Sequence, residues 1–165
     1  MKRLFLDMDG TLARFYEIDQ YMEKMFEENF FRNLDPYTRV IKGIYKLQEK
    51  HPDIEIFVLS ACISERSKIE KAEWLEEYFP IDKAHQIFVM VGESKADFVP
   101  GGVSKDDYLV DDYNKNLHEW TEAGGVGIKI KNEINCQNGT WRGARVSTFD
   151  DPDDTVANIE AILEL

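Results

Sequence analysis

The chain alternates between short apolar runs and longer segments in which apolar side chains recur every three to four residues. The apolar runs predict five strands, over residues 3–8, 54–59, 87–91, 108–110 and 126–130. Runs this short, with few polar interruptions, are typical of strands buried on both faces of a sheet. Because helical segments separate the runs, we predict an α/β fold with a Rossmann-like, doubly wound, mainly parallel five-stranded sheet.

The helical segments carry recognisable end signals. Ser64 is a suitable N-cap for a helix over residues 65–79, because its hydroxyl can accept from the first turn. The spacing predicts that this helix turns inward Ile69, Ala72, Leu75 and Phe79. Further helices are expected after Asp35-Pro36, over residues 115–122 and over residues 154–164.

The segment between the first two strands is long, aromatic and acidic. Near-helical spacing is shared by Tyr21, Met22, Met25, Phe26 and Phe30, which predicts helix here. We therefore expect residues 14–35 to form a small helical cap over the strand ends. At 165 residues, the chain is expected to be one domain, 1–165, that carries this insertion.

The net charge excludes some classes of binding partner, and the cysteine content indicates the cellular compartment. The net charge of −12 argues against a nucleic acid polymer or an anionic membrane surface as partner, since both favour basic proteins. A small phosphate ester held by a metal ion remains compatible with it. Cys62 and Cys136 form neither a C-x-x-C motif nor a disulfide framework, and no stretch reaches transmembrane length. We therefore expect a soluble, cytoplasmic protein; the pattern leaves its oligomeric state open.

The first strand ends in an unusual group of residues, L-F-L-D-M-D-G-T-L over residues 4–12. Side chains alternate along a strand, so Asp7 and Asp9 start on the same side. Gly10 allows a tight turn and leaves room for a ligand beside the main chain. Two adjacent carboxylates repel each other unless a cation or a proton lies between them. An ordinary polar turn is the alternative interpretation.

Other polar residues follow the neighbouring strands. Ser60 and Ala61 follow the second strand, Lys95 follows the third, and the pair Asp111-Asp112 follows the fourth. Because ligands bind at the carboxyl ends of parallel strands, we expect these residues along one rim of the sheet.

With these motifs, the chain resembles the haloacid dehalogenase (HAD) superfamily of phosphohydrolases. The first family motif, an apolar strand followed by Asp-x-Asp-Gly-Thr, matches residues 4–12, and the second, a strand ending in Ser or Thr, matches F-V-L-S at 57–60. The third is a lysine, and the fourth is an acidic pair after a strand, matched by Y-L-V-D-D at 108–112. The resemblance covers residues 4 to 130 and implies phosphoryl transfer.

Phosphoryl transfer assigns an expected role to each of these residues. Asp7 would be the nucleophile, forming an aspartyl phosphate, and Asp9 would be the general acid and base. Mg²⁺ would be held by Asp7, the main-chain carbonyl of Asp9, Asp111 and, through water, Asp112. Phosphate oxygens would be held by Ser60, by the amides of Gly10 and Ala61, and by a lysine. Lys95 is favoured for that lysine, because Lys105 precedes the fourth strand and so belongs at the opposite end of the sheet.

The substrate is less constrained than the chemistry. Chain length, the short cap, the stretch D-Y-L-V-D-D-Y-N-K-N-L and the loop containing Trp141 resemble the 5'(3')-deoxyribonucleotidases. That resemblance implies hydrolysis of a nucleoside monophosphate, with Phe15 or Tyr16 stacking on the base. Two alternatives stay open: a HAD phosphatase for a sugar phosphate or another small phosphate ester, and a catalytically inactive phosphate-binding module.

Overall fold

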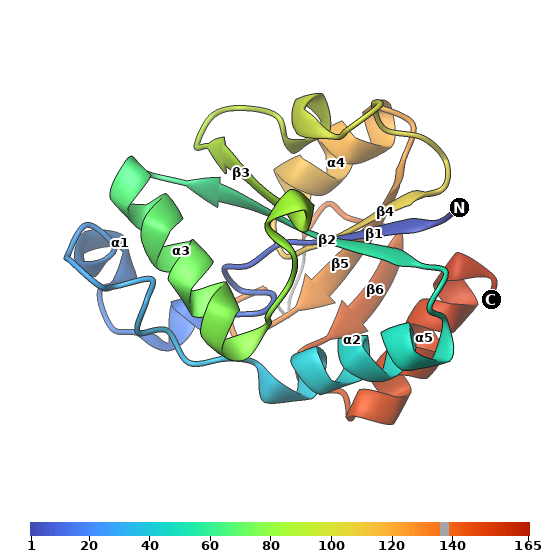
Figure 1. Cartoon of the computed structure of the whole chain (residues 1–165), viewed down its shortest axis with the longest axis horizontal. Coiled ribbons are helices and arrows are strands. Elements are labelled where there is room, and N and C mark those ends of the chain that lie inside the picture. Colours follow the sequence, from blue (N-terminus) through green and yellow to red (C-terminus); the bar gives the residue numbers. More distant parts are fainter. Residues whose placement is uncertain (136–138) are drawn as a thin grey trace.

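Within the described part of the chain, six parallel strands form a single sheet at the centre of the molecule (Figure 1). The computed structural model describes residues 1–135 and 139–165. The strand order is β3-β2-β1-β4-β5-β6. The strands are β1 (Arg3–Leu6), β2 (Glu55–Cys62), β3 (Gln86–Met90), β4 (Asp107–Asp111), β5 (Val126–Lys131) and β6 (Ala144–Ser147). All five predicted strands are present, and β2 continues through Ser60 and Ala61 rather than ending before them.

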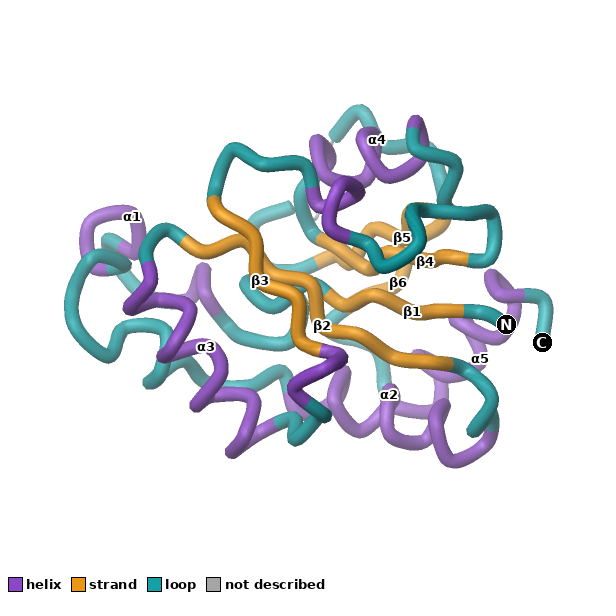
Figure 2. Tube along the Cα trace, turned by 45° about the horizontal axis from the view of Figure 1, so that its top comes forward, coloured by secondary structure: helices purple, strands orange, loops and turns teal. Residues whose placement is uncertain are grey.

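Helices cover both faces of the sheet, as Figures 1 and 2 show. The α-helices are α1 (Tyr21–Lys24), α2 (Thr38–Lys50), α3 (Glu65–Tyr78), α4 (Asn114–Glu122) and α5 (Pro152–Leu163). Short 3-10 turns lie at Phe15–Glu17, Lys83–His85 and Lys95–Phe98. One apolar cluster joins α2, α3 and α5 to Leu4 and Leu6 of β1, and a second joins α4 to Phe5. Alternation along β1 therefore anchors a layer on each face.

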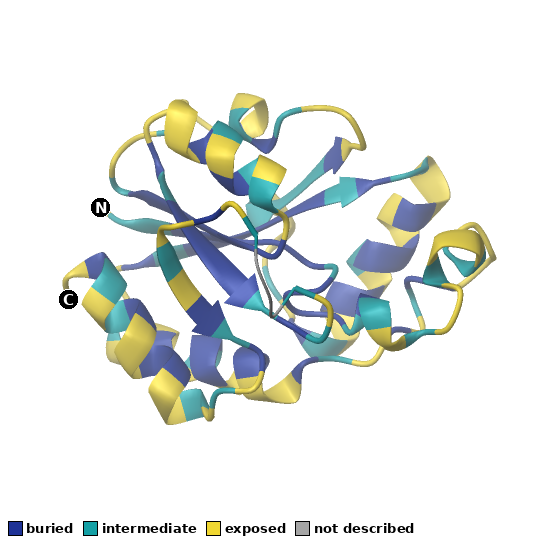
Figure 3. Cartoon of the chain, turned by 180° about the vertical axis from the view of Figure 1, so that it is seen from behind, coloured by how far each residue is buried: buried dark blue, intermediate teal, exposed yellow. Residues whose placement is uncertain are grey.

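The sixth strand was missed because it lacks the pattern of a buried strand. Only Val146 of β6 is buried, whereas Arg145 is exposed. As the edge of the sheet, β6 pairs with β5 alone, so its sequence alternates instead of forming an apolar run. In Figure 3 the central strands are largely buried, while α5 exposes its outer side.

Helix α3 begins as predicted, and Leu75 and Phe79 are buried as expected, but Ile69 is not. The Ser64 hydroxyl accepts from the amide of Ser67, and the Ser67 hydroxyl accepts from the amide of Ser64. Ile69, predicted to face the core, is 59% exposed. Glu70 and Lys71 are buried instead. Specific polar partners hold these two charged side chains inside, which hydrophobic periodicity does not detect.

The segment over residues 14–35 is not the helical unit that its spacing predicted. It contains a 3-10 turn, the four-residue helix α1 and a series of turns. Gln20 and Asn29 have positive φ values of 59° and 63°, which interrupt a right-handed helix. Its aromatic rings gather into a cluster rather than lining one helix face. The segment lies along α3, where Arg32 pairs with Glu77.

Two further predictions from the sequence concern the cellular compartment of the protein: that no segment spans a membrane, and that the two cysteines form no disulfide. Within the described residues, every helix is too short or too polar to traverse a bilayer. Cys62 is a buried free thiol. Cys136 lies outside the described residues, so the expected lack of a disulfide between these two cysteines stays a prediction.

Candidate active site

Three buried carboxylates converge at the carboxyl ends of β1 and β4. Asp7 follows β1, and Asp111 and Asp112 stand at the end of β4. Each offers an oxygen atom within 4.8 Å of the others, and their exposed fractions are 6%, 0% and 7%. Carboxylate oxygens gathered in this way are the donor set that hard divalent cations prefer. The cluster can therefore hold a metal ion.

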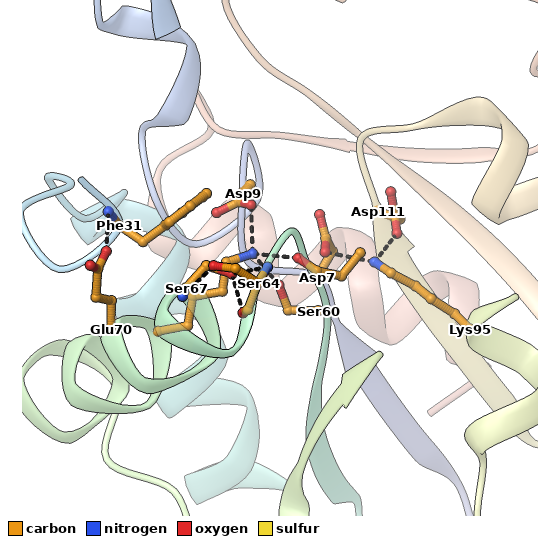
Figure 4. Close-up of polar contacts among 11 residues, drawn as sticks. Asp7, Asp9, Phe31, Ser60, Ser64, Ser67, Glu70, Lys95 and Asp111 are labelled. Atoms are coloured by element: carbon orange, nitrogen blue, oxygen red, sulfur yellow. Dashed lines mark hydrogen bonds and ion pairs between the residues drawn. The ribbon is translucent and has the colours of Figure 1, made fainter. Parts of the chain in front are cut away.

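Lys95 is the buried cation of this cluster. It lies in the turn that follows β3, and its Nζ is 2.6 Å from Asp7 Oδ1 and 2.6 Å from Asp111 Oδ2 (Figure 4). Burial lowers the pKa of Lys95, but the contacts with Asp111 and Asp7 outweigh burial and raise it above its usual value. Lys105 lies in an exposed turn just before β4, at the opposite end of the sheet.

One lysine does not balance three carboxylates. Burial raises the pKa of Asp111 to about 6, even though Lys95 opposes the rise. Burial, together with Asp111 and Asp7, raises the pKa of Asp112 well above its usual value. The site therefore carries surplus negative charge, which a divalent cation would neutralise.

Hydrogen bonds hold the acidic pair Asp111-Asp112 in position. The donors are Tyr113, Asn116, Asn132 and Asn135. Asp111 accepts from the amide of Tyr113 at 2.8 Å and from the carboxamide of Asn116 at 3.0 Å. Asn132 donates to Asp112 Oδ2 at 3.1 Å and to the Gly10 carbonyl at 3.0 Å. Asn135 donates to the Asp112 carbonyl at 3.1 Å. These asparagines were missed from the sequence. Asn132 and Asn135 lie in the polar loop directly after β5, and Asn116 lies on α4.

A second buried lysine, Lys71, contacts Asp9 and the end of β2. Its Nζ lies 2.7 Å from Asp9 Oδ2, 3.0 Å from Ser60 Oγ and 2.6 Å from the Ala61 carbonyl. It also lies 4.7 Å from the centre of the Phe31 ring. Sequence reasoning missed Lys71, which looks like one more surface lysine of an amphipathic helix. In Figure 4, Asp9 and Lys95 lie on opposite sides of Asp7.

The surroundings of Asp9 favour the protonated form of its carboxyl group. Burial raises its pKa, while Lys71 opposes the rise. Within the part of the chain that the structure describes, the Oδ1 of Asp9 is buried and has no hydrogen-bond partner. A carboxyl group with a raised pKa can act as a general acid near neutral pH.

Gly10 fits the tight turn but not the predicted phosphate contact. It has a φ of 78°, and an added Cβ would meet Asp112 Oδ2 and Tyr16 Cε2, both at 2.6 Å. Only glycine is therefore accommodated here. Its amide, however, donates to the Ala13 carbonyl at 2.8 Å. The expectation that this amide holds phosphate is therefore corrected, because the turn itself uses the donor.

The two predicted substrate residues have different surroundings. Phe15 is 8% exposed and packs against Tyr21, Phe30 and Phe31, so its ring belongs to the core of the segment. Tyr16 is half-buried beside the carboxylates. Burial, followed by the negative charge of Asp112, raises its pKa.

Several solved structures have a similar fold. D,D-heptose 1,7-bisphosphate phosphatase from B. bronchiseptica, complexed with magnesium and phosphate, aligns with a TM-score of 0.63 and 15% identity over 100% of both chains. The enzyme of the same name from Burkholderia thailandensis aligns with a TM-score of 0.62 and 11% sequence identity, covering 98% of this chain and 99% of the other. A HAD-superfamily hydrolase from Ehrlichia chaffeensis aligns with a TM-score of 0.54 and 17% sequence identity over 100% of both chains.

These likenesses show that the protein has the fold of the HAD-superfamily phosphatases, as its motifs predicted. No protein-family model and no curated protein sequence matches the chain.

Proposed function

We propose that the protein is a Mg²⁺-dependent phosphomonoesterase for small phosphate esters that acts through an aspartyl phosphate on Asp7. The observation that carries the proposal is the convergence of Asp7, Asp9 and Asp111 with two buried lysines at one rim. A catalytically inactive phosphate-binding module would not need a second carboxylate with a raised pKa beside the first.

The metal ligands in this proposal are Asp7, Asp111, Asp112 and the main-chain carbonyl of Asp9. The fit rests on the close approach of the three carboxylates and on the hardness of their oxygen donors. When bound, Mg²⁺ would supply the positive charge that lets a phosphate approach these carboxylates.

Asp7 and Asp9 divide the chemistry between them. A carboxylate oxygen of Asp7 forms a bond to phosphorus while the bond from phosphorus to the ester oxygen breaks, and Asp9 gives that oxygen its proton. Asp9 then takes a proton from water as the water attacks phosphorus. The Asp7–phosphorus bond breaks, and inorganic phosphate leaves with the original Asp7 carboxylate restored.

The two lysines have separate positions in this scheme. Lys71 contacts Ser60, the hydroxyl expected to bind a phosphate oxygen, and so places a positive charge on the phosphate side. Lys95 contacts Asp7 and Asp111 and holds the metal-binding carboxylates in place. Ser60 and the Ala61 amide stay the proposed phosphate contacts, as expected from the sequence. Lys71 takes the place of the Gly10 amide and of Lys95 among them.

A sugar phosphate or similar small ester is the better-supported substrate class. Two of the similar structures are phosphatases for a heptose bisphosphate, and the Phe15 ring is buried among the aromatic rings of its own segment. A nucleoside monophosphate stays a second candidate because of one observation: the Tyr16 ring lies beside Gly10 and Asp112, where it can stack on a base.

A phosphatase screen with Mg²⁺ tests both the phosphatase activity and the substrate class. The panel is a generic aryl phosphate, hexose phosphates, and ribo- and deoxyribonucleoside monophosphates. We expect hydrolysis of the aryl ester and a higher kcat/KM for one natural class. Hydrolysis of no ester would reject the phosphatase assignment, whereas the preferred class decides between the two substrates.

A Tyr16 variant separates the two classes further. If the ring stacks on a base, Tyr16→Ala costs about 1–3 kcal/mol in kcat/KM for nucleotides and much less for the aryl ester. Phe26→Ala is the matched control, because Phe26 lies in the same segment but is 65% exposed. Equal losses on both substrates would show that Tyr16 does not contact a base.

A further inference from the structure

Glu70 of α3 is a buried carboxylate that has no part in the chemistry described above. It is 5% exposed, and within the described part of the chain it makes no ion pair. Its two oxygens accept instead from backbone amides of the segment over residues 14–35: Oε1 from Asn29 at 2.8 Å and Oε2 from Phe31 at 3.1 Å (Figure 4). A buried carboxylate is destabilising unless hydrogen bonds satisfy it, so Glu70 and these two amides depend on each other.

The backbone of residues 29–31 is shaped around this carboxylate. Asn29 has a φ of 63°, a left-handed conformation that is unfavourable in residues other than glycine. The amide of Phe30 donates to the Glu27 carbonyl at 3.4 Å, so only the first and third amides of the turn reach Glu70. Hydrogen bonds to a charged acceptor are stronger than those to a neutral one. Glu70 therefore fixes the turn against α3.

The turn held by Glu70 places the Phe31 ring over the active site. Phe31 is 2% exposed, and the centre of its ring lies 4.7 Å from Nζ of Lys71, the residue next to Glu70 in α3. An aromatic ring attracts an ammonium group and excludes water from it. Lys71 is fully buried and donates to Asp9 and to Ser60. Glu70 and Lys71 thus connect the segment to the groups expected to contact the phosphate and the leaving oxygen.

Helix α3 holds the same segment at two further points, both farther along the helix. Trp74 donates to the Leu34 carbonyl at 2.7 Å, and Glu77 pairs with Arg32 at 2.5 Å. The pair of Glu77 and Arg32 is partly exposed, near the end of α3. The segment therefore stays attached to α3 even when the turn at residues 29–31 is released.

We propose that Glu70 is a positioning residue for the reaction. By holding residues 29–31, it keeps the Phe31 ring over Lys71, and so keeps the Lys71 ammonium directed at Asp9 and Ser60. The inference rests on the proposed function, in which Lys71 contacts the phosphate. It adds that the segment over residues 14–35 serves the chemistry through Lys71 as well as covering the strand ends.

Kinetics of Glu70→Gln test this role. The glutamine keeps the shape of the side chain but turns an NH₂ group toward one of the two amides. We expect kcat for an aryl phosphate to fall about tenfold, because Lys71 loses its fixed position. Glu77→Gln is the matched control: it removes another α3 carboxylate that contacts the same segment, and it should leave kcat within about twofold of the wild type, since an exposed ion pair contributes little.

A double variant separates positioning from a purely structural role. If Glu70 acts through Lys71, adding Glu70→Gln to Lys71→Met should cause little further loss of kcat, because residues that act together are not additive. If Glu70 only stabilises the fold, Glu70→Gln lowers the unfolding temperature but leaves the kcat of the folded protein at the wild-type value. That result, or losses that multiply in the double variant, would overturn the proposal.

Amide hydrogen exchange followed by NMR tests the contact without relying on activity. The Asn29 and Phe31 amides should be protected in the wild type, and Glu70→Gln should speed the exchange of at least one of them about tenfold. The Arg14 amide, which donates to the Asp35 carbonyl at 2.8 Å, is the internal control and should exchange as in the wild type. Unprotected amides in the wild type, or equal rates in the variant, would overturn the proposal.

The two experiments also distinguish this inference from the proposed function. A wild type that hydrolyses esters, with an unchanged kcat in Glu70→Gln, rejects the positioning role and leaves the phosphatase assignment standing. A wild type that hydrolyses no ester rejects the proposed function, and the exchange rates of Asn29 and Phe31 then decide whether Glu70 holds the turn.

Discussion

Strands β1 and β4 carry opposite electrostatic arrangements at their two ends. At the amino end, Arg3 of β1 meets Asp107 of β4 through two contacts, 2.5 Å from Nε to Oδ1 and 2.7 Å from Nη2 to Oδ2. Burial raises the pKa of Asp107, but the contacts with Arg3 and Ser104 together outweigh burial, so the pKa lies below its usual value. Charges are matched there, one for one.

At the carboxyl end of the same strands, charges are unmatched. Asp7, Asp111 and Asp112 share Lys95, and burial raises the pKa of both members of the acidic pair. A matched pair contributes to stability, whereas a carboxylate surplus destabilises the metal-free fold and creates affinity for a cation. The amino end is thus structural, and the carboxyl end has the properties of a functional site.

The largest expected effect is at Asp7. Replacement by asparagine removes the proposed nucleophile but keeps its shape, so kcat for an aryl phosphate should fall by about 10⁴-fold or more. Steady-state kinetics measure the loss, and circular dichroism checks that the fold persists. Activity within tenfold of the wild type would refute the covalent route.

Removal of the metal should have the next largest effect. In excess chelator we expect activity to fall by at least about 10³-fold, because surplus carboxylate charge repels the substrate phosphate. The thermal unfolding transition should remain cooperative, since the carboxylates lie at strand ends and not in the apolar clusters. Added Mg²⁺ should restore activity, and Asp111→Ala should raise the Mg²⁺ concentration needed. Full activity in chelator would exclude a metal requirement.

Replacing the two buried lysines should affect the Mg²⁺ requirement in different ways. Lys71→Met should lower kcat about 10²-fold with little change in the Mg²⁺ requirement, because Lys71 contacts Asp9 and Ser60. Lys95→Met should also lower kcat but should tighten Mg²⁺ binding, because it removes a cation that competes for Asp7 and Asp111. Titration of activity with Mg²⁺ measures both. Identical Mg²⁺ curves for the two variants would contradict this division of the site.

At the amino end, Asp107→Asn should destabilise the protein by about 2 kcal/mol at neutral pH, since it weakens a charged hydrogen-bonded pair. The pKa of Asp107 is lower in the folded state, so this stabilisation is present above the unfolded-state pKa of about 3.9. It is lost as the pH falls through the folded-state pKa. Urea unfolding of both proteins across this range tests the prediction, and a difference that stays constant at low pH would contradict it.

The smallest effect is expected at Asp112. Asp112→Asn removes one like charge from the carboxylate cluster, so without metal the free energy of unfolding should rise by about 1 kcal/mol. Mg²⁺ should stabilise the variant less than the wild type. Thermal unfolding with and without Mg²⁺ measures both changes. Destabilisation without metal would mean that the Asn132 contact outweighs the repulsion.

The sequence by itself determined the acidic half of the site, because that half depends on local rules. Asp7 and Asp111 each end an apolar run, and parallel strands bring their carboxyl ends to one rim. The same rule separates Lys95, which follows a strand, from Lys105, which precedes one. Strand position, alternation and the Gly10 turn were therefore predictable without the tertiary structure.

Only the tertiary structure decided which side chains complete the site. Lys71 and Asn132 are recruited by contacts with residues far away in sequence, and no local periodicity marks them. The same holds for edge strand β6, whose partner β5 lies across a polar loop, and for residues 14–35, whose aromatic rings pack as a cluster. A buried polar residue is held by its partners, and those partners are assembled only when the chain folds.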